Sequence, residues 1–172
     1  RLVAERILRE IDSEGRLTSS LAKCFSDHRF EPLVEHELGH LLAQRIHAIA
    51  LGYEDINDHD KLRLDPLLAL TCGKADLLGE GRSGEDRGKA LAGKSTLNRL
   101  ELGSNGLGKT KKIHPHPGRI RDFLIGEGVR RIPRRSRVIT LDFDATDDPV
   151  HGGQEGRFFH GYYGHYCYLP LY

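Results

Sequence analysis

The sequence contains no methionine and no apolar run long enough to cross a membrane. A transmembrane helix needs about 20 consecutive apolar residues, and the N-terminus lacks the pattern of a signal peptide, so we expect no membrane association. The last six residues, Cys-Tyr-Leu-Pro-Leu-Tyr, form an apolar run still in progress, and an unpaired apolar strand edge promotes aggregation. Since an initiator methionine is also lacking, the sequence predicts a fragment of a longer protein.

Cysteines are few, at positions 24, 72 and 167, and they are unevenly spaced. This spacing matches neither a disulfide framework nor a zinc-binding pattern, so the sequence predicts a protein of the reducing cytoplasm. The composition is typical of a soluble protein, with 38% hydrophobic residues, 30% charged residues and a net charge of +1. A chain of 172 residues is long enough to bury one good core.

Apolar residues at helical spacing dominate residues 1–72 and predict a small helical region. Gly15 ends the first run, Pro32 suits the first turn of a long helix, and the Asp65-Pro66 pair caps another helix. The predicted helices cover residues 2–15, 17–25, 32–52 and 67–70. Together they form the first of three predicted regions.

Residues 73–137 form the second predicted region, a connecting segment that is first glycine-rich and then basic. One short helix is predicted within it, over residues 96–102 with Ser95 as its cap. Residues 109–137 contain three lysines and seven arginines but only two acidic residues, which leaves a net charge of +8. Such a run is usually a solvated surface, but it also suits the attraction of a polyanion to a metal site.

The third region, residues 138–172, begins with an apolar, β-branched run that predicts a buried strand. Asp142 and Asp144 lie on this strand and point to one face, roughly 6.5–7 Å apart along the chain. Two carboxylates this close repel one another, which a divalent cation between them would offset. We therefore predict a metal site at these two residues; the alternative is a strand end followed by an acidic turn. The aromatic residues 154–172 predict further strands of the same sheet.

Two other motifs match known patterns but lack the required context. Residues 36–40, His-Glu-Leu-Gly-His, match the HExxH zinc motif, yet Ala43 and Ile46 stand where the extended motif needs glycine and histidine. Residues 88–95 and 103–110 both match the phosphate-loop pattern GxxxxGKS/T, but no hydrophobic strand precedes either of them. We therefore expect neither a zinc protease site nor a nucleotide site.

The segment Asp142-Phe-Asp144-Ala-Thr146 fits two different chemistries. It matches the DxDxT/V signature of haloacid-dehalogenase-like phosphatases, in which Asp142 would be the nucleophile and Asp144 the acid/base. It also matches an Asp-x-Thr at the end of the first strand of a ribonuclease-H-like nuclease, in which Asp144 would bind the catalytic metals. A phosphatase strand usually opens its domain, whereas this strand follows a helical region and a basic segment, which favours the nuclease.

Three stretches of the chain carry a resemblance to a known family. They are residues 45–66, especially ALGYEDINDHDKLRLDP, residues 91–101 (LAGKSTLNRLE), and residues 141–172, which contain LDFDATDDPVHG, QEG, FHGYY and YCYLPLY. Together they resemble the DDE transposases of bacterial insertion sequences, specifically the group-1 DDE type of the insertion-sequence 1380 family. In that family, the stretches around residues 36–40 and 93–96 hold neither a zinc site nor a nucleotide site.

The resemblance implies an α+β fold, in which an N-terminal helical region that contacts transposon DNA precedes the first strands of a truncated ribonuclease-H-like sheet. It implies a Mg²⁺ (or Mn²⁺) site made of two aspartates and a glutamate. Only the first aspartate is carried over to this chain, at Asp144, with Asp142 as the next choice. Phosphodiester cleavage and strand transfer would then belong to the intact enzyme and not to this fragment.

The implied partners are transposon-end DNA, target DNA and further copies of the enzyme in a transposition complex. Basic residues of the +8 segment would contact DNA phosphates and make binding dependent on salt. The arginines expected to do so are Arg130, Arg131, Arg134, Arg135 and Arg137.

Overall fold

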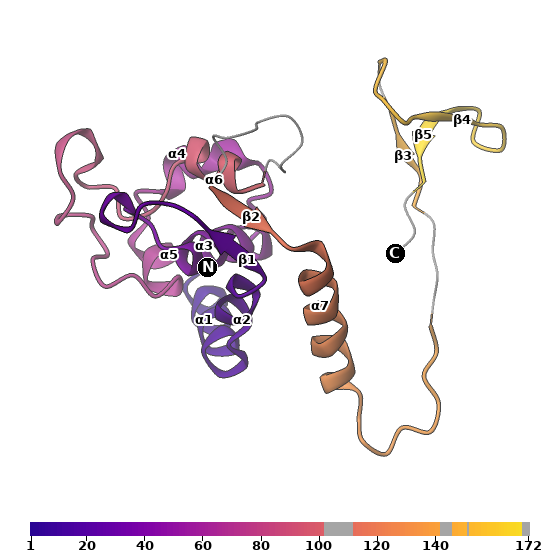
Figure 1. Ribbon diagram of the computed structural model, residues 1–172, viewed down its shortest axis with the longest axis horizontal. Helices are drawn as coiled ribbons and strands as arrows, with labels where there is room; N and C mark the ends of the chain where they lie inside the picture. The colour runs from indigo at the N-terminus through magenta and orange to yellow at the C-terminus, as the bar shows by residue number, and fades with distance from the viewer. Residues whose placement is uncertain (102–111, 142–145, 151, 170–172) are drawn as a thin grey trace. The chain divides into compact units, whose positions relative to one another are not determined.

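The chain folds into two compact units of an α+β protein, Arg1–Arg131 and Ile132–Tyr172 (Figure 1). The computed structural model describes residues 1–101, 112–141, 146–150 and 152–169. All the α-helices of these described residues lie in the first unit, together with a two-stranded sheet, and a three-stranded sheet lies in the second. Among the described residues, no helix is long and apolar enough to span a membrane.

The first unit is built from seven α-helices within the described residues. They are α1 (Leu2–Gly15), α2 (Leu17–Ala22), α3 (Leu38–Ala50), α4 (His59–Leu62), α5 (Pro66–Thr71), α6 (Lys94–Glu101) and α7 (Pro117–Arg131). Three short 3-10 helices connect them: η1 (Glu31–Leu33), η2 (Ile56–Asp58) and η3 (Gly84–Asp86). Figure 1 shows α3 among the other helices of this unit, with α7 following β2.

Side chains cap the starts of α2 and of the helix predicted over residues 67–70. After α1 the chain turns at Arg16, which has a left-handed conformation, and the carboxylate of Asp12 accepts hydrogen bonds from the backbone N–H (2.8 Å) and hydroxyl (2.6 Å) of Thr18. Asp65 caps α5 by accepting from the N–H groups of Leu67 and Leu68 at 2.9 and 3.2 Å. These bonds satisfy donors that a helix start leaves unpaired.

The prediction of one helix over residues 32–52 is wrong at its start, because α3 begins at Leu38. Pro32 lies in η1, and Glu37 is extended, with φ −61° and ψ 150°. A hydrogen bond occupies the backbone just before α3. The Arg29 guanidinium, which pairs with Asp27, donates to the carbonyl of His36 at 2.9 Å. A helix is also shorter than expected over residues 17–25, since α2 ends at Ala22.

Phe25 belongs instead to β1 (Phe25–Asp27), which pairs antiparallel with β2 (Ile113–Pro115). The pairing continues beyond the strands, because the N–H of His116 donates to the carbonyl of Cys24 at 2.9 Å. Helix α7 follows directly, with Pro117 at its first position. This helix occupies part of the basic stretch, where the sequence suggested no element; glycines at 118, 126 and 128 interrupt its apolar pattern.

Two apolar clusters form the core of the first unit. One packs α3, α4 and α5 against the irregular residues 90–91 and contains Ala43, Ala48, Leu62, Leu68, Ala69, Cys72, Ala90 and Leu91. The other packs α3 and α6 against β2 and contains Leu41, Leu42, Ala92, Leu97, Leu100 and Ile113. Gln44 is buried on α3 and bonds both backbone groups of Ala92, at 2.8 and 3.0 Å, and the ring of His59 at 2.9 Å. Its side chain therefore takes the place of a strand partner for residue 92.

The second unit contains a small antiparallel sheet of strand order β3-β5-β4. Its strands are β3 (Asp148–Pro149), β4 (Phe158–His160) and β5 (His165–Tyr168). In this sheet β4 and β5 form a hairpin, with Phe159 opposite Tyr166, and β3 adds on the other side of β5, with Pro149 opposite Cys167. The strands predicted within residues 154–172 are thus confirmed for β4 and β5.

The strand predicted from residue 138 onward does not form over its described residues. Residues 138–141 have no regular structure, and Val138, Ile139 and Leu141 are exposed. A β-branched run becomes a strand only where a neighbouring strand takes its backbone hydrogen bonds. No strand of the described residues pairs with residues 138–141, so this apolar run stays irregular.

Candidate functional site

The two carboxylates predicted to bind metal, Asp142 and Asp144, lie outside the described residues. The phosphatase interpretation of the same segment depends on the same two residues. The structure therefore does not distinguish between the phosphatase and the nuclease interpretations. The chain is described again from Thr146, which is exposed and irregular. The next acidic residues along the described chain are Asp147 and Asp148. Asp147 belongs to a cluster of three polar side chains.

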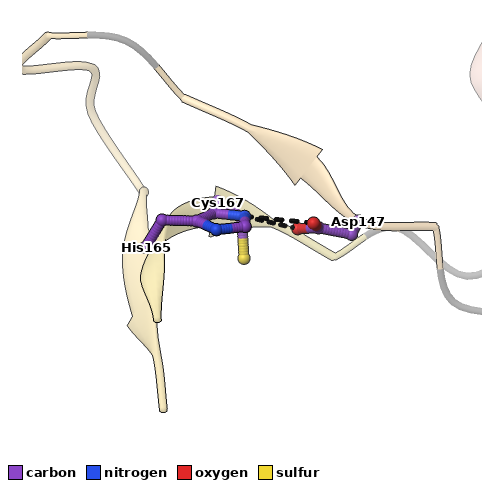
Figure 2. Close-up of side chains that lie close together, drawn as sticks. All are labelled: Asp147, His165 and Cys167. Atoms are coloured by element: carbon purple, nitrogen blue, oxygen red, sulfur yellow. Dashed lines mark hydrogen bonds and ion pairs between the residues drawn. The ribbon is translucent and has the colours of Figure 1, made fainter. Parts of the chain in front are cut away.

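This cluster consists of Asp147, His165 and Cys167 (Figure 2). Nε2 of His165 lies 3.1 and 3.0 Å from the two carboxylate oxygens of Asp147. One ligand atom from each of the three residues lies within 4.8 Å of the others. Figure 2 shows the imidazole facing the carboxylate, with the sulfur of Cys167 close to both. No other group of three such side chains gathers within the part of the chain that the structure describes.

The antiparallel pairing of β3 with β5 brings these three side chains together. His165 and Cys167 are two residues apart on β5 and therefore point to the same face of the sheet. Asp147 precedes β3 and is two residues before Pro149, the register partner of Cys167, so its side chain also points to that face. The sequence alone did not reveal this site, because Asp147 lies 18 residues before His165 and only the strand pairing brings them together.

The three side chains of the cluster differ in burial, and burial affects the pKa of Cys167. Cys167 has no exposed surface, whereas the side chains of His165 and Asp147 are partly exposed. Burial, followed by hydrogen bonding to Asp147, raises the pKa of the Cys167 thiol above its ordinary value. The buried thiol and the imidazole thus both lie next to one carboxylate.

The predicted DNA-contacting arginines fall into two groups. Arg130 and Arg131 lie at the end of α7 and pair with Glu127, whose side chain is nearly buried; Arg131 lies 2.8 Å from its Oε2. Arg134, Arg135 and Arg137 follow the helix, are exposed, and form no ion pair with any described carboxylate. The second group is therefore the one that no described carboxylate compensates.

The HExxH residues are separated by the helix start, since His36 precedes α3 and His40 lies on it. His36 is buried beside Arg82, and burial together with that cation lowers its pKa from 6.5 to about 3. The first phosphate-loop match ends in α6, and Lys94 there lies 3.2 Å from the carboxylate of Asp60. The second match, at 103–110, lies outside the described residues.

Comparison with known proteins defines the class of this chain. The family model of the transposase DDE domain, group 1, matches residues 5–172. The chain therefore belongs to this family of DDE transposase domains. Such domains generally depend on divalent metal ions, and the family's substrates are DNA. No curated protein and no solved structure matches the chain significantly.

Proposed function

We propose that this chain is part of a DNA transposase of the insertion-sequence 1380 family, located in the cytoplasm and acting on transposon ends and target DNA. The observation that carries the proposal is the match of the DDE transposase family to residues 5–172. In the intact enzyme, this activity is phosphodiester cleavage followed by strand transfer. Copies of the enzyme assemble on the DNA ends in a transposition complex.

The metal chemistry of this proposal is assigned to Asp144, with Asp142 as the next choice for the first aspartate of the triad. The donor set fits a hard divalent cation, because carboxylate oxygens are the ligands that Mg²⁺ and Mn²⁺ prefer. A divalent cation bound there supplies Lewis-acid stabilisation of charge on the phosphodiester. The fold proposed around this aspartate is ribonuclease-H-like, with β3, β4 and β5 contributing strands to its sheet.

DNA binding is assigned to the basic stretch that contains α7. Arg134, Arg135 and Arg137 are exposed and free of ion pairs with the described carboxylates, so their charges are available to phosphates. Arg130 and Arg131 share Glu127, so fewer of their N–H groups remain for a phosphate. The three arginines without an ion pair among the described residues are therefore expected to contribute more to DNA affinity.

The test measures DNA duplex affinity of the 172-residue chain against salt concentration. Replacing Arg134, Arg135 and Arg137 together by alanine should make the slope of log K against log salt less negative by roughly 2–3, because each phosphate contact contributes about −0.9. The matched control replaces the same three arginines by lysine, which keeps the charge and should keep the slope. An alanine variant with unchanged affinity and slope would overturn the assignment to this stretch.

A second arm separates DNA binding from phosphatase chemistry. Asp142→Asn and Asp144→Asn should leave the affinity for DNA without metal unchanged, since neither residue is assigned to phosphate contacts. Hydrolysis of a small phosphate ester that Asp142→Asn abolishes would replace the transposase assignment with a phosphatase. This outcome is distinguishable from weak DNA binding, which leaves phosphate esters intact.

A further inference from the structure

We propose that Asp147, His165 and Cys167 bind a zinc ion, at a site distinct from the carboxylates assigned to Mg²⁺. Their ligand atoms already lie within 4.8 Å of one another on one face of the sheet (Figure 2). The proposal is independent of the transposase assignment, because it rests only on this geometry and on the chemistry of the three donors.

The donor set selects zinc over magnesium. Thiolate, imidazole and carboxylate are the three ligand types that zinc uses in proteins, whereas magnesium takes oxygen ligands and retains water. Metal–ligand distances of about 2.0–2.3 Å put neighbouring ligand atoms of a tetrahedral site roughly 3.3–3.6 Å apart. Nε2 of His165 is 3.0 Å from Oδ2 of Asp147, so these two ligands need to separate only slightly to admit the ion. Solvent fills the fourth position of such a site.

The hydrogen bonds of the cluster show which protons the ion would replace. Without metal, Nε2 of His165 lies 3.0 Å from Oδ2 of Asp147, and Sγ of Cys167 lies within 4.8 Å of a ligand atom of each. When zinc binds, the Cys167 thiol would release its proton to solvent and the imidazole of His165 would carry its proton on Nδ1 in place of Nε2, so that Sγ and Nε2 each offer a lone pair. Only small shifts of the ligand atoms are then needed to surround the ion.

The second unit also has a structural use for such an ion. Its strands have two, three and four residues, and Cys167 is the single buried residue among its described residues. Small units with little apolar core often need a metal or a disulfide to be stable. Zinc bound by residues from both sides of the β3–β5 pair would fix this sheet, and its removal would loosen it.

Cobalt(II) titration of the purified 172-residue chain tests the proposal, because cobalt takes the place of zinc and its spectrum reports both geometry and thiolate ligation. We expect one equivalent to give intense visible bands of a tetrahedral site and a thiolate-to-cobalt charge-transfer band in the near ultraviolet, both displaced by one equivalent of zinc. No charge-transfer band from the wild-type chain would overturn the proposal.

Single substitutions assign the ligands. Cys167→Ser should abolish the charge-transfer band, and His165→Gln or Asp147→Asn should weaken metal affinity by more than the 10–100-fold typical of an outer partner. Asp148→Asn is the matched control for Asp147, because the neighbouring residue is exposed and outside the cluster. Persistence of the band in Cys167→Ser would move the ligation to Cys24 or Cys72 and overturn the site.

A gain-of-function variant keeps the proposal testable even if the variants that lack a ligand fail to fold. Asp147→Cys places a second thiolate in the same position, so we expect tighter binding and roughly doubled charge-transfer intensity. His36→Gln and His40→Gln control for the HExxH motif and should leave the spectrum unchanged. A spectrum that is unaltered by Asp147→Cys, or lost in His36→Gln, would contradict ligation by this cluster.

Discussion

The two units of this chain are stabilised in different ways. Residues 1–131 bury two apolar clusters around α3, and a buried glutamine, Gln44, forms hydrogen bonds with the backbone of Ala92. Residues 132–172 bury one described side chain, Cys167, and expose most of their aromatic rings. The first unit thus has the apolar burial that dominates folding free energy, whereas the second depends on backbone pairing and on one polar cluster.

This difference in burial concerns the residues proposed to bind metal. The unit with the large core holds the helices, while the residues assigned to metal chemistry fall in the unit with little core of its own. Such a unit gains proportionally more from a bound ion, strand partners or DNA, because binding free energy adds directly to a small folding free energy. The predictions below test this contrast, starting with the largest expected effect.

Removing core volume from the first unit should have the largest effect. Leu68 on α5 is fully buried, and Leu68→Ala should lower the free energy of unfolding by about 2–5 kcal/mol through lost burial and a residual cavity. Leu64→Ala is the control, because Leu64 is 57% exposed and should change stability little. Urea unfolding followed by far-ultraviolet circular dichroism measures this, since all described α-helices lie in the first unit. Hydrogen exchange of Leu68→Ala gives the contradicting outcome. Equal losses of amide protection in both units would show that the units unfold together and are not stabilised separately.

Acid should weaken the first unit through its buried histidines. The pKa of His36 is lowered to about 3 by burial and by Arg82, so the unfolded chain binds a proton here at a pH where the folded one does not. The free energy of unfolding should therefore fall as pH decreases from 6.5 towards 3, by at most about 1.4 kcal/mol per pH unit for this group.

His36→Gln should flatten that pH dependence, measured as urea unfolding at a series of pH values. The same change at exposed His28 serves as the control. Burial also lowers the pKa of His40, His47 and His59, so part of the slope should remain in the His36 variant. A slope identical to that of the unsubstituted chain would show that His36 does not contribute.

The smallest effect is expected in the second unit. Phe159 and Tyr166 lie opposite each other on β4 and β5, with ring centroids 5.4 Å apart in an edge-to-face arrangement, and both are exposed. Phe159→Ala should lower the protection of β5 amides in hydrogen exchange by about 0.5–1.5 kcal/mol. Val138→Ala, at an exposed and irregular position, should not. A larger loss would mean that this ring pair, and not the Asp147 cluster, holds the sheet.

Several elements were predictable because their signals are local. The apolar spacing of residues 2–15 and the Asp65-Pro66 cap correctly located α1 and α5, and the aromatic stretch after residue 154 located β4 and β5. Helix α6 begins two residues earlier than expected, at Lys94. The family was recognised from its motifs, and the match over residues 5–172 confirms the DDE transposase assignment.

Other predictions failed where distant contacts decide the backbone. The start of α3 depends on an arginine–carbonyl bond between residues 29 and 36, and the run at 138–141 lacks a strand partner among the described residues. Helix α7 was missed because its glycines interrupt the apolar pattern. The site residues Asp142 and Asp144 stay predictions, as do the DNA contacts of the five arginines.

By itself, the sequence determined the helical character of the N-terminal half, the family, and the positions of its acidic and basic stretches. Each of these is encoded in neighbouring residues, by periodicity, capping or a contiguous motif. The tertiary structure alone decided that β1 pairs with β2, some 90 residues away, and that Asp147 meets His165 and Cys167. Those contacts depend on strand register and chain reversal, which join residues that no local pattern connects.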